Sequence, residues 1–232
     1  MPTPKKKKQQ EQDGSSPKAL PVHANYRAVT RCWTAHVGAL RRWIETEDEA
    51  TDVFRSLGQF MGRIPIVSRC LYDVRKLGAL AALDDGLAGQ LTCDHRRECQ
   101  RLADHLRDVT LVELNRAADD LTKAVEAAIA LVASPKDGWD PAAPAGACPM
   151  SPLEQITWMQ QLNTMFFNEL WRKEVLIRNL LRAVWDPLDA DDDDAATTAR
   201  SAARLWPRIS AESFIDNYFL EIVFTNHDLV TS

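Results

Sequence analysis

The stretch Ser151–Val184, SPLEQITWMQQLNTMFFNELWRKEVLIRNLLRAV, predicts one long amphipathic helix. Ser151 stands at the N-cap, Pro152 at the first helical position and Glu154 three residues after the cap, which is the spacing of a capping box. At a rise of about 1.5 Å per residue, the helix is roughly 50 Å long. Its apolar residues recur three or four apart at Ile156, Met159, Leu162, Phe166, Leu170, Ile177, Leu180 and Val184. Lys173 interrupts this stripe, and we expect its alkyl stem to cover apolar surface while its ammonium group stays in water.

A long-helix bundle is also expected in the N-terminal half of the chain, over residues 23–133. Apolar residues keep a three-to-four rhythm over Tyr26–Ile64, and the glycines and proline of Gly58–Pro65 predict the end of this helix. The acidic segment Glu45–Glu49 fits a solvated turn of the same helix or a short joint. A first long helix therefore leads into the rest of the bundle.

Two further helices are expected before the middle of the chain. The second runs from Pro65 to about Leu83, and Asp84–Gly86 carries a turn signal. The third, Leu87–Ala133, is the longest, and its length suits coiled-coil-like packing against helices of similar length. Its expected inner stripe is Leu87, Leu91, His95, Cys99, Leu102, Leu106, Val109, Glu113, Ala117, Leu121, Val125, Ala128 and Val132.

The sequence predicts a helical hairpin over the C-terminal residues 151–232. A Pro- and Gly-rich linker at 134–150 precedes it, and an acidic loop at 186–198 interrupts it. Ser210 is the expected cap of the final helix, which we expect to fold back onto the Ser151 helix near Trp171. The apolar stripe of this final helix is Phe214, Ile215, Tyr218, Phe219, Ile222 and Val223.

Composition supports an all-α fold. The 232 residues include only nine glycines and 26% charged residues, which favours helix over sheet. The sequence therefore predicts an elongated bundle of long amphipathic, coiled-coil-like helices with a C-terminal helical hairpin. The net charge of −5 gives no basic footprint for direct, sequence-specific nucleic acid binding. The apolar runs are shorter than the roughly 20 residues that span a bilayer, so no membrane association is expected.

Residues 1–22 are expected to be a disordered basic tail, since four prolines and many polar residues leave little to bury. Lys5, Lys6, Lys7 and Lys8 form a basic tetrad, which predicts a nuclear-import signal or, alternatively, a solubilising tail. No secretory signal follows the tetrad. Five cysteines with irregular spacing then favour free thiols in a reducing compartment, and we expect the protein in nucleus and cytoplasm.

Residues that carry catalytic or metal chemistry are sparse. Cys93, His95 and Cys99 lack the tetrahedral arrangement held by turns that structural zinc requires, so we interpret them as ordinary helix residues. The acidic run Asp189–Asp194 lacks the central glycine of a calcium loop, and Arg200 stands where its closing glutamate belongs. No phosphate-binding loop, nucleophile elbow or HExxH motif occurs. We therefore expect a protein that is not an enzyme and holds no cofactor or metal.

A resemblance to a known family rests on short motifs in the C-terminal third. These are Ser151-Pro152, Trp158-Met159-Gln160, Trp171-Arg172-Lys173 with Leu176, and Leu205-Trp206-Pro207-Arg208-Ile209-Ser210 before an apolar terminal helix. They resemble the C-terminal half of the AIRIM family, the ribosome-maturation factors that interact with AAA+ ATPases of the AFG-two class. The architecture also resembles the cyclin-dependent-kinase-two-interacting protein, which partners AIRIM, but the Trp206–Ser210 step favours the AIRIM side.

The resemblance implies a non-catalytic helical adaptor. Such a subunit pairs with a second small helical subunit, the cyclin-dependent-kinase-two-interacting protein, and binds the hexameric ATPase. Through it the adaptor acts on pre-ribosomal particles in large-subunit maturation, and the same complex is implicated in replisome protein turnover. Aromatic residues at helical spacing are core or interface anchors. The candidate partner-interface residues are Trp158, Trp171, Arg172, Lys173 and Trp206.

A rival interpretation is a structural coiled-coil bundle protein of a cytoskeletal or kinetochore-type assembly. That class predicts self-association without an ATPase, whereas an adaptor predicts a different protein as partner. The sequence leaves both open.

Overall fold

The computed structural model of the chain describes residues 24–75, 81–133, 139–144, 150–185, 192–208, 210 and 212–231. Over these residues the chain is helical with irregular connections and contains no strand, which confirms the expected all-α class. The elements are α1 (Ala24–Arg75), α2 (Ala81–His105), the π-helical turn η1 (Leu106–Thr110), α3 (Leu111–Ala133), α4 (Pro152–Trp185), α5 (Asp192–Leu205) and α6 (Asn217–Thr231). None of these helices is both long and apolar enough to cross a membrane.

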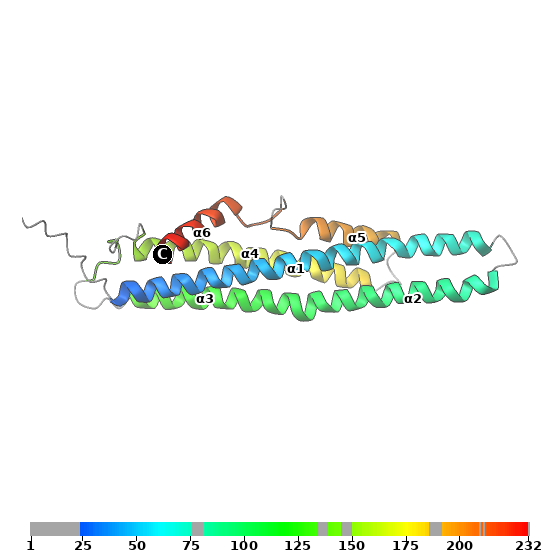
Figure 1. Cartoon of the computed structure of the whole chain (residues 1–232), viewed down its shortest axis with the longest axis horizontal. Helices are drawn as coiled ribbons and strands as arrows, with labels where there is room; N and C mark the ends of the chain where they lie inside the picture. Colours follow the sequence, from blue (N-terminus) through cyan, green and yellow to red (C-terminus); the bar gives the residue numbers. More distant parts are fainter. Residues whose placement is uncertain are drawn as a thin grey trace, which may run out of the picture.

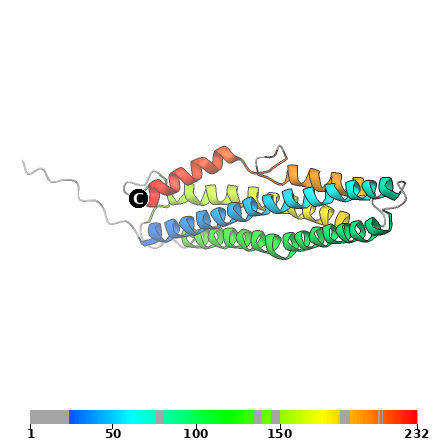
Figure 2. The same ribbon diagram turned by 45° about the vertical axis from the view of Figure 1, so that its right-hand side comes forward.

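The helices form an elongated bundle (Figures 1 and 2). Helices α1 and α4 start at the same end and run in the same direction, whereas the continuous run α2–η1–α3 returns along α1. Helices α5 and α6 lie end to end on the opposite side of the α1–α4 pair, and both run back toward the N-terminal end of α1. The bundle therefore has an up–down–up–down arrangement whose fourth position is shared by two short helices.

One hydrophobic core runs through the bundle and joins the two parts that the sequence divides at 134–150. Its largest fully buried side chains include Trp33, Trp43 and Phe54 of α1, Phe166 of α4, and Trp206 directly after α5. The Trp43 and Phe166 rings meet edge to face at 5.2 Å, and the Phe54 and Trp206 rings lie 4.5 Å apart. Because each buried side chain of this size contributes about 1.5–3 kcal/mol, these aromatic contacts hold α1, α4 and the segment after α5 together.

The expected end of the first helix at Pro65 is wrong. Helix α1 continues through Pro65 to Arg75, and the expected turn Asp84–Gly86 lies inside α2. Proline removes one backbone hydrogen bond and normally breaks or kinks a helix. Here Met61 and Ile64 of the preceding turn are buried, and α1 packs along α2, so tertiary packing carries the helix past this position.

The expected inner stripe of the long third helix is confirmed only in part, because Leu91 is exposed and because the helix contains η1. The Leu111 N–H donates to the Leu106 carbonyl five residues back, which adds one residue to a turn. Within η1 the buried position moves from the expected Val109 to Thr110, and just after it from Glu113 to Leu114, whereas Ala117, Leu121, Val125 and Ala128 are buried as expected. Val109 is exposed, and a sequence reading with a constant helical period could not find this shift.

The capping box at Ser151 is confirmed. The Glu154 N–H donates to Ser151 Oγ at 3.2 Å, and Glu154 Oε2 accepts from the Ser151 N–H at 2.7 Å. The expected cap of the last helix is wrong, since Ser210 lies well before α6. Asp216 takes that role, and its Oδ1 accepts from the Phe219 N–H at 3.1 Å.

Helix α6 folds back onto α4, as the hairpin requires, but not near Trp171. The Phe219 ring lies 5.4 Å from the Trp158 ring, close to the start of α4. Helix α6 also contacts α1, where the Arg41 guanidinium pairs with Asp228 at 3.3 Å. The Trp206 carbonyl accepts from Lys173 and the Phe214 N–H donates to Glu169, so the chain after α5 follows α4 toward its N-terminal end before α6 begins.

Other expectations concern the segments between elements. Residues 1–22, including Lys5–Lys8, lie outside the described residues, as do 186–191 of the expected acidic loop. The rest of that loop is wrong as a loop, because α5 begins at Asp192. Of the expected linker 134–150, residues 139–144 and 150 are described; Trp139 packs against the core and Met150 is buried.

Helix α1 contains glycines at interior positions where the structure has room for a side chain. A Cβ built at Gly58 or Gly62 meets no atom within 4 Å. Gly58→Ala and Gly62→Ala should each raise the free energy of unfolding by about 0.5–1 kcal/mol, because alanine loses less backbone entropy on folding. Chemical denaturation measures the change, with the exposed Ala35→Gly as the control of opposite sign. A loss of stability in either variant would mean that the backbone needs glycine there.

Candidate functional site

Four charged side chains lie together in the interior, and we call them the buried ionic cluster: Glu47, Glu169, Arg172 and Lys173. Lys173 is fully buried, and its Nζ lies 3.2 Å from Glu47 Oε1 and 3.2 Å from Glu169 Oε1. Arg172 Nε donates to Glu169 Oε2 at 3.0 Å, and its Nη2 forms a second bond to the same carboxylate. The two positive and two negative groups therefore balance one another away from water.

The helical repeat explains how α4 supplies three of these groups. Glu169 precedes Arg172 by three residues and Lys173 by four, so all three can meet on one side of the helix. Glu47 comes from α1, which lies beside this part of α4. The expectation that the Lys173 ammonium stays in water is wrong, and so is the expectation that the whole of Glu45–Glu49 is solvated, since Glu47 is buried.

The cluster binds the segment that follows α5. Lys173 Nζ donates to the Trp206 carbonyl at 2.6 Å and lies 4.2 Å from the centre of the Trp206 ring. The indole Nε1 of Trp206 donates to the Glu47 carbonyl at 3.1 Å. Further along, the backbone N–H of Arg208 donates to Glu47 Oε1, and that of Phe214 donates to Glu169 Oε2 at 3.1 Å. Each buried carboxylate thus accepts a backbone donor from the segment between α5 and α6.

Burial dominates the electrostatics of the cluster. It raises the pKa of Glu47, whose Oε2 has no hydrogen-bond partner among the described residues, although Lys173 and Arg208 act in the other direction. It also lowers the pKa of Lys173, against the attraction of the two carboxylates. For Glu169 burial acts to raise the pKa, but the hydrogen bond from Arg172 and the charge of Lys173 hold it below its ordinary value. The cluster is enclosed, and each of its four side chains has at least one charged partner within it, so its role is to fix the chain after α5.

Three candidate interface residues belong to this interior. Lys173 and Trp206 are fully buried and Arg172 is nearly so, which corrects their placement on a partner surface. The spacing of Glu169, Arg172 and Lys173 in the sequence was a signal for an intrahelical ionic group. Nothing in the sequence pointed to Glu47, which meets them only through tertiary packing.

The other two candidates lie toward the surface of α4. Trp158 is half-buried, with the Trp33 ring 6.3 Å away and the Phe219 ring 5.4 Å away. Trp171 is 64% exposed, and Phe167, one turn earlier, is 66% exposed. Sequence reasoning missed Phe167, although residues four apart on a helix are neighbours. The structure thus brings Trp171 together with a second large exposed ring.

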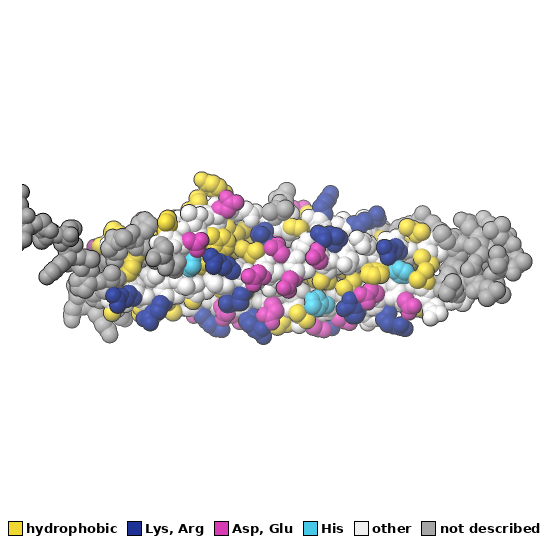
Figure 3. All heavy atoms as spheres, in the orientation of Figure 1, with side chains coloured by type: hydrophobic (Ala, Val, Ile, Leu, Met, Phe, Trp, Pro, Cys, Tyr) yellow, Lys and Arg dark blue, Asp and Glu magenta, His cyan; other side chains and the backbone are white. Residues whose placement is uncertain are grey.

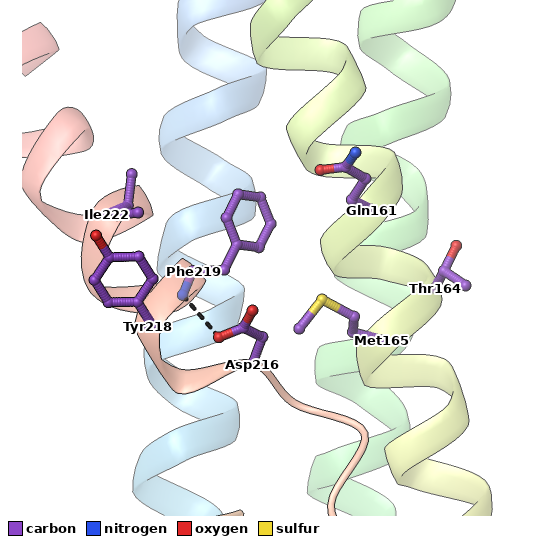
Figure 4. Close-up of a pocket in the computed structure, with 7 residues that line it drawn as sticks. All are labelled: Gln161, Thr164, Met165, Asp216, Tyr218, Phe219 and Ile222. Atoms are coloured by element: carbon purple, nitrogen blue, oxygen red, sulfur yellow. Dashed lines mark hydrogen bonds between the residues drawn. The ribbon is translucent and has the colours of Figure 1, made fainter.

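A groove between α4 and α6 lies beside this pair. It has a volume of about 640 Å³ and is lined by Gln161, Thr164, Met165, Asp216, Tyr218, Phe219 and Ile222. Figure 4 shows Gln161 and Met165 extending from α4 toward α6, with the Phe219 ring between the two helices. Thr164 precedes Phe167 by three residues on α4, so the groove and the exposed rings adjoin. Together they form a largely apolar surface along α4 and α6.

The face of the molecule seen in Figure 3 is different in character. Lys, Arg, Asp and Glu are interspersed over α1 and α3, whereas hydrophobic side chains project near the start of α6. Between the same two helices, Arg42 of α1 pairs with Asp120 of α3 at 2.8 Å. Exposed pairs of this kind contribute little to stability and give the face no single sign of charge.

The cysteine–histidine set forms no metal centre in the described part of the chain, where no three His, Cys, Asp or Glu side chains gather as metal ligands. Cys93 is exposed, and His95 Nδ1 lies 2.7 Å from the Leu91 carbonyl. Cys99 is buried, and burial raises the pKa of its thiol to about 11. A thiol with so high a pKa is a poor ligand and a poor nucleophile.

Comparison of the chain with family models, with curated proteins and with solved structures gives no match. The geometry of the exposed α4 surface and of the buried ionic cluster is therefore the basis for a functional proposal.

Proposed function

We propose that this protein is a non-catalytic helical adaptor that binds another protein through the exposed surface of α4. The observation that carries the proposal is the exposure of Phe167 and Trp171, at 66% and 64%, on a helix whose other face is fully packed. Large adjoining apolar side chains on a folded protein mark interaction sites, and tryptophan is enriched among residues that dominate binding energy.

The resemblance of the C-terminal motifs to the AIRIM family is the basis for proposing which complex this adaptor belongs to. We propose an adaptor subunit of an AFG-two-class AAA+ ATPase complex that acts in large ribosomal subunit maturation and in replisome protein turnover. Its second partner is a small helical subunit of the cyclin-dependent-kinase-two-interacting type. Two of the motifs that resemble the family are the Ser151 cap, which starts α4, and the Trp206 segment, which the buried ionic cluster binds after α5.

Affinity purification of the tagged full chain under native conditions, followed by mass spectrometry, tests this proposal. Recovery of an AFG-two-class ATPase together with a second small helical protein is the expected result. Recovery of the chain alone, in a self-associated form, would instead favour a structural coiled-coil bundle protein. Nuclear and cytoplasmic localisation, with Lys5–Lys8 as the import signal, stays a prediction that fluorescence imaging of a tetrad variant can check.

A Phe167→Ala/Trp171→Ala double variant should lose at least tenfold of its partner affinity, because alanine removes rings that a partner would bury. Its thermal midpoint should stay close to that of the parent, since both side chains face solvent. Ile66→Ala is the matched control, as Ile66 is 60% exposed at the other end of the bundle. Unchanged partner recovery in the double variant would exclude this surface of α4 as the binding site.

A further inference from the structure

Beyond the two exposed rings, the outer face of α4 carries a longer pattern. Phe167, Trp171, Val175, Arg178 and Arg182 follow one another at intervals of three or four residues, and we call them the α4 stripe. At about 100° per residue they stay within one narrow face of the helix. Val175 is half-buried and the other four are exposed, so the whole stripe is accessible. It is roughly 22 Å long.

The two arginines of the stripe differ from most other arginines along the bundle. Arg41, Arg42 and Arg107 all pair with an aspartate of the chain. Within the residues that the structure describes, neither Arg178 nor Arg182 forms an ion pair. The stripe therefore presents two aromatic rings at one end and, at the other, two positive charges that have no ion-pair partner among the described residues.

We propose that the α4 stripe binds one helix of another protein, with apolar side chains against Phe167 and Trp171 and with aspartate or glutamate opposite Arg178 and Arg182. This inference rests on the proposed adaptor function and names the chemistry of its partner. The three-to-four spacing along a straight helix is the pattern against which another helix packs. Charge complementarity then requires an acidic partner and sets which end of its helix lies near Arg182.

Single-stranded nucleic acid is the other ligand that combines aromatic and arginine contacts. The structure favours a helix, because the stripe has only two cations while the chain as a whole carries a net charge of −5. Nucleic acid binding without sequence preference draws its affinity from many phosphate contacts along a positively charged groove. The test below includes this ligand as an outcome.

Fluorescence anisotropy with the full chain tests the inference with three defined probes. The first is an amphipathic helical peptide of five turns with a leucine stripe and glutamates at one end; the second replaces these glutamates by lysines; the third is a 20-nucleotide single-stranded RNA. We expect the acidic peptide to bind at least tenfold more tightly than the basic peptide, with an affinity that falls as salt is added.

Charge reversal gives the sharpest readout. The Arg178→Glu/Arg182→Glu variant should bind the basic peptide more tightly than the acidic one. The Arg178→Gln/Arg182→Gln variant should bind the two peptides with equal affinity. Arg182 lies in the last turn of α4, where a cation also stabilises the helix dipole, so the thermal midpoint of each variant is measured in parallel. Phe167→Ala should weaken the binding of both peptides equally, because it removes an apolar contact without changing the charge.

Three results would overturn the inference. These are equal binding of the two peptides to the parent chain, tighter binding of RNA than of the acidic peptide, and self-association of the chain that charge reversal abolishes, which would make a second copy the occupant. The proposed function is tested separately by the native purification. An ATPase complex recovered intact with the charge-reversed variant would refute the α4 stripe as the binding site while leaving the adaptor function in place. Absence of the ATPase from the purification of the parent chain would refute the adaptor function, while the peptide measurements still test the α4 stripe.

Discussion

Lys173→Met is expected to lower the free energy of unfolding by about 3–5 kcal/mol, which is the usual cost of removing one partner from a buried ion pair. Lys173 Nζ lies 3.2 Å from a carboxylate oxygen of both Glu47 and Glu169. Methionine fills a similar volume but leaves Glu47 buried without a cation. It also removes the hydrogen bond to the Trp206 carbonyl, so the segment after α5 loses an anchor. Chemical denaturation measures the loss.

Two controls separate charge burial from a general effect of mutation. The double variant Lys173→Met/Glu47→Gln should recover part of the loss, because a neutral amide costs less to bury than an unpaired carboxylate. Arg55→Ala removes an exposed pair with Asp52 and should change stability by less than about 1 kcal/mol. If Lys173→Met unfolds within 1 kcal/mol of the parent, roughly the value of an exposed pair, the ammonium group is not buried between the carboxylates.

The second large effect is a loss of stability in acid caused by His36. This side chain is fully buried in α1, and burial lowers its pKa from 6.5 to about 4, with the Met159 backbone acting in the other direction. The unfolded chain therefore binds a proton that the folded chain excludes between pH 6.5 and 4. Stability contributed by neutral His36 is present above pH 6.5 and is lost as the pH falls, by about 3 kcal/mol between pH 7 and pH 4.

Comparison of the parent with His36→Leu and His36→Gln isolates this contribution. Neither leucine nor glutamine titrates, so the difference in unfolding free energy between parent and variant should shift by about 3 kcal/mol across this pH range. Groups such as Glu47, whose raised pKa has the opposite effect on stability as the pH changes, contribute equally to both proteins and cancel. A difference that stays constant from pH 7 to pH 4 would contradict the burial of a neutral imidazole.

Helix α4 shows how far local signals reach. The capping box, the start at Pro152, and the buried stripe from Ile156 to Leu180 were all predictable, and the structure contains each of them. These features depend on residues within four positions of one another, where backbone hydrogen bonds and helical periodicity determine the outcome. Local interactions are therefore sufficient to predict a single helix and the face that it buries.

The same local rules failed where packing overrides them. Pro65 was expected to end a helix that continues because α1 packs along α2. The π-helical turn Leu106–Thr110 contains no proline or glycine, yet it moves the buried positions by one residue at Thr110 and Leu114. A glycine or proline inside a helix costs about 1–3 kcal/mol, and the contacts along a long helix can outweigh this cost.

The candidate site divides in the same way. Exposure of Trp171 could be anticipated from a tryptophan on the polar face of an amphipathic helix. The burial of Lys173 and Trp206 could not, because it depends on Glu47, which is more than 120 residues away along the chain. A lysine on an apolar stripe is compatible with a solvated ammonium or with a buried ion pair, and only the position of a distant carboxylate distinguishes the two.

Helix content, the limits of α4 and the all-α class follow from the amino-acid order, because period and capping are properties of neighbouring residues. The tertiary structure decided which charges are buried, where α6 docks and which face of α4 stays open. Those outcomes depend on contacts between residues far apart in the chain, since the free energy of a buried charge or ring is set by the groups that surround it in space.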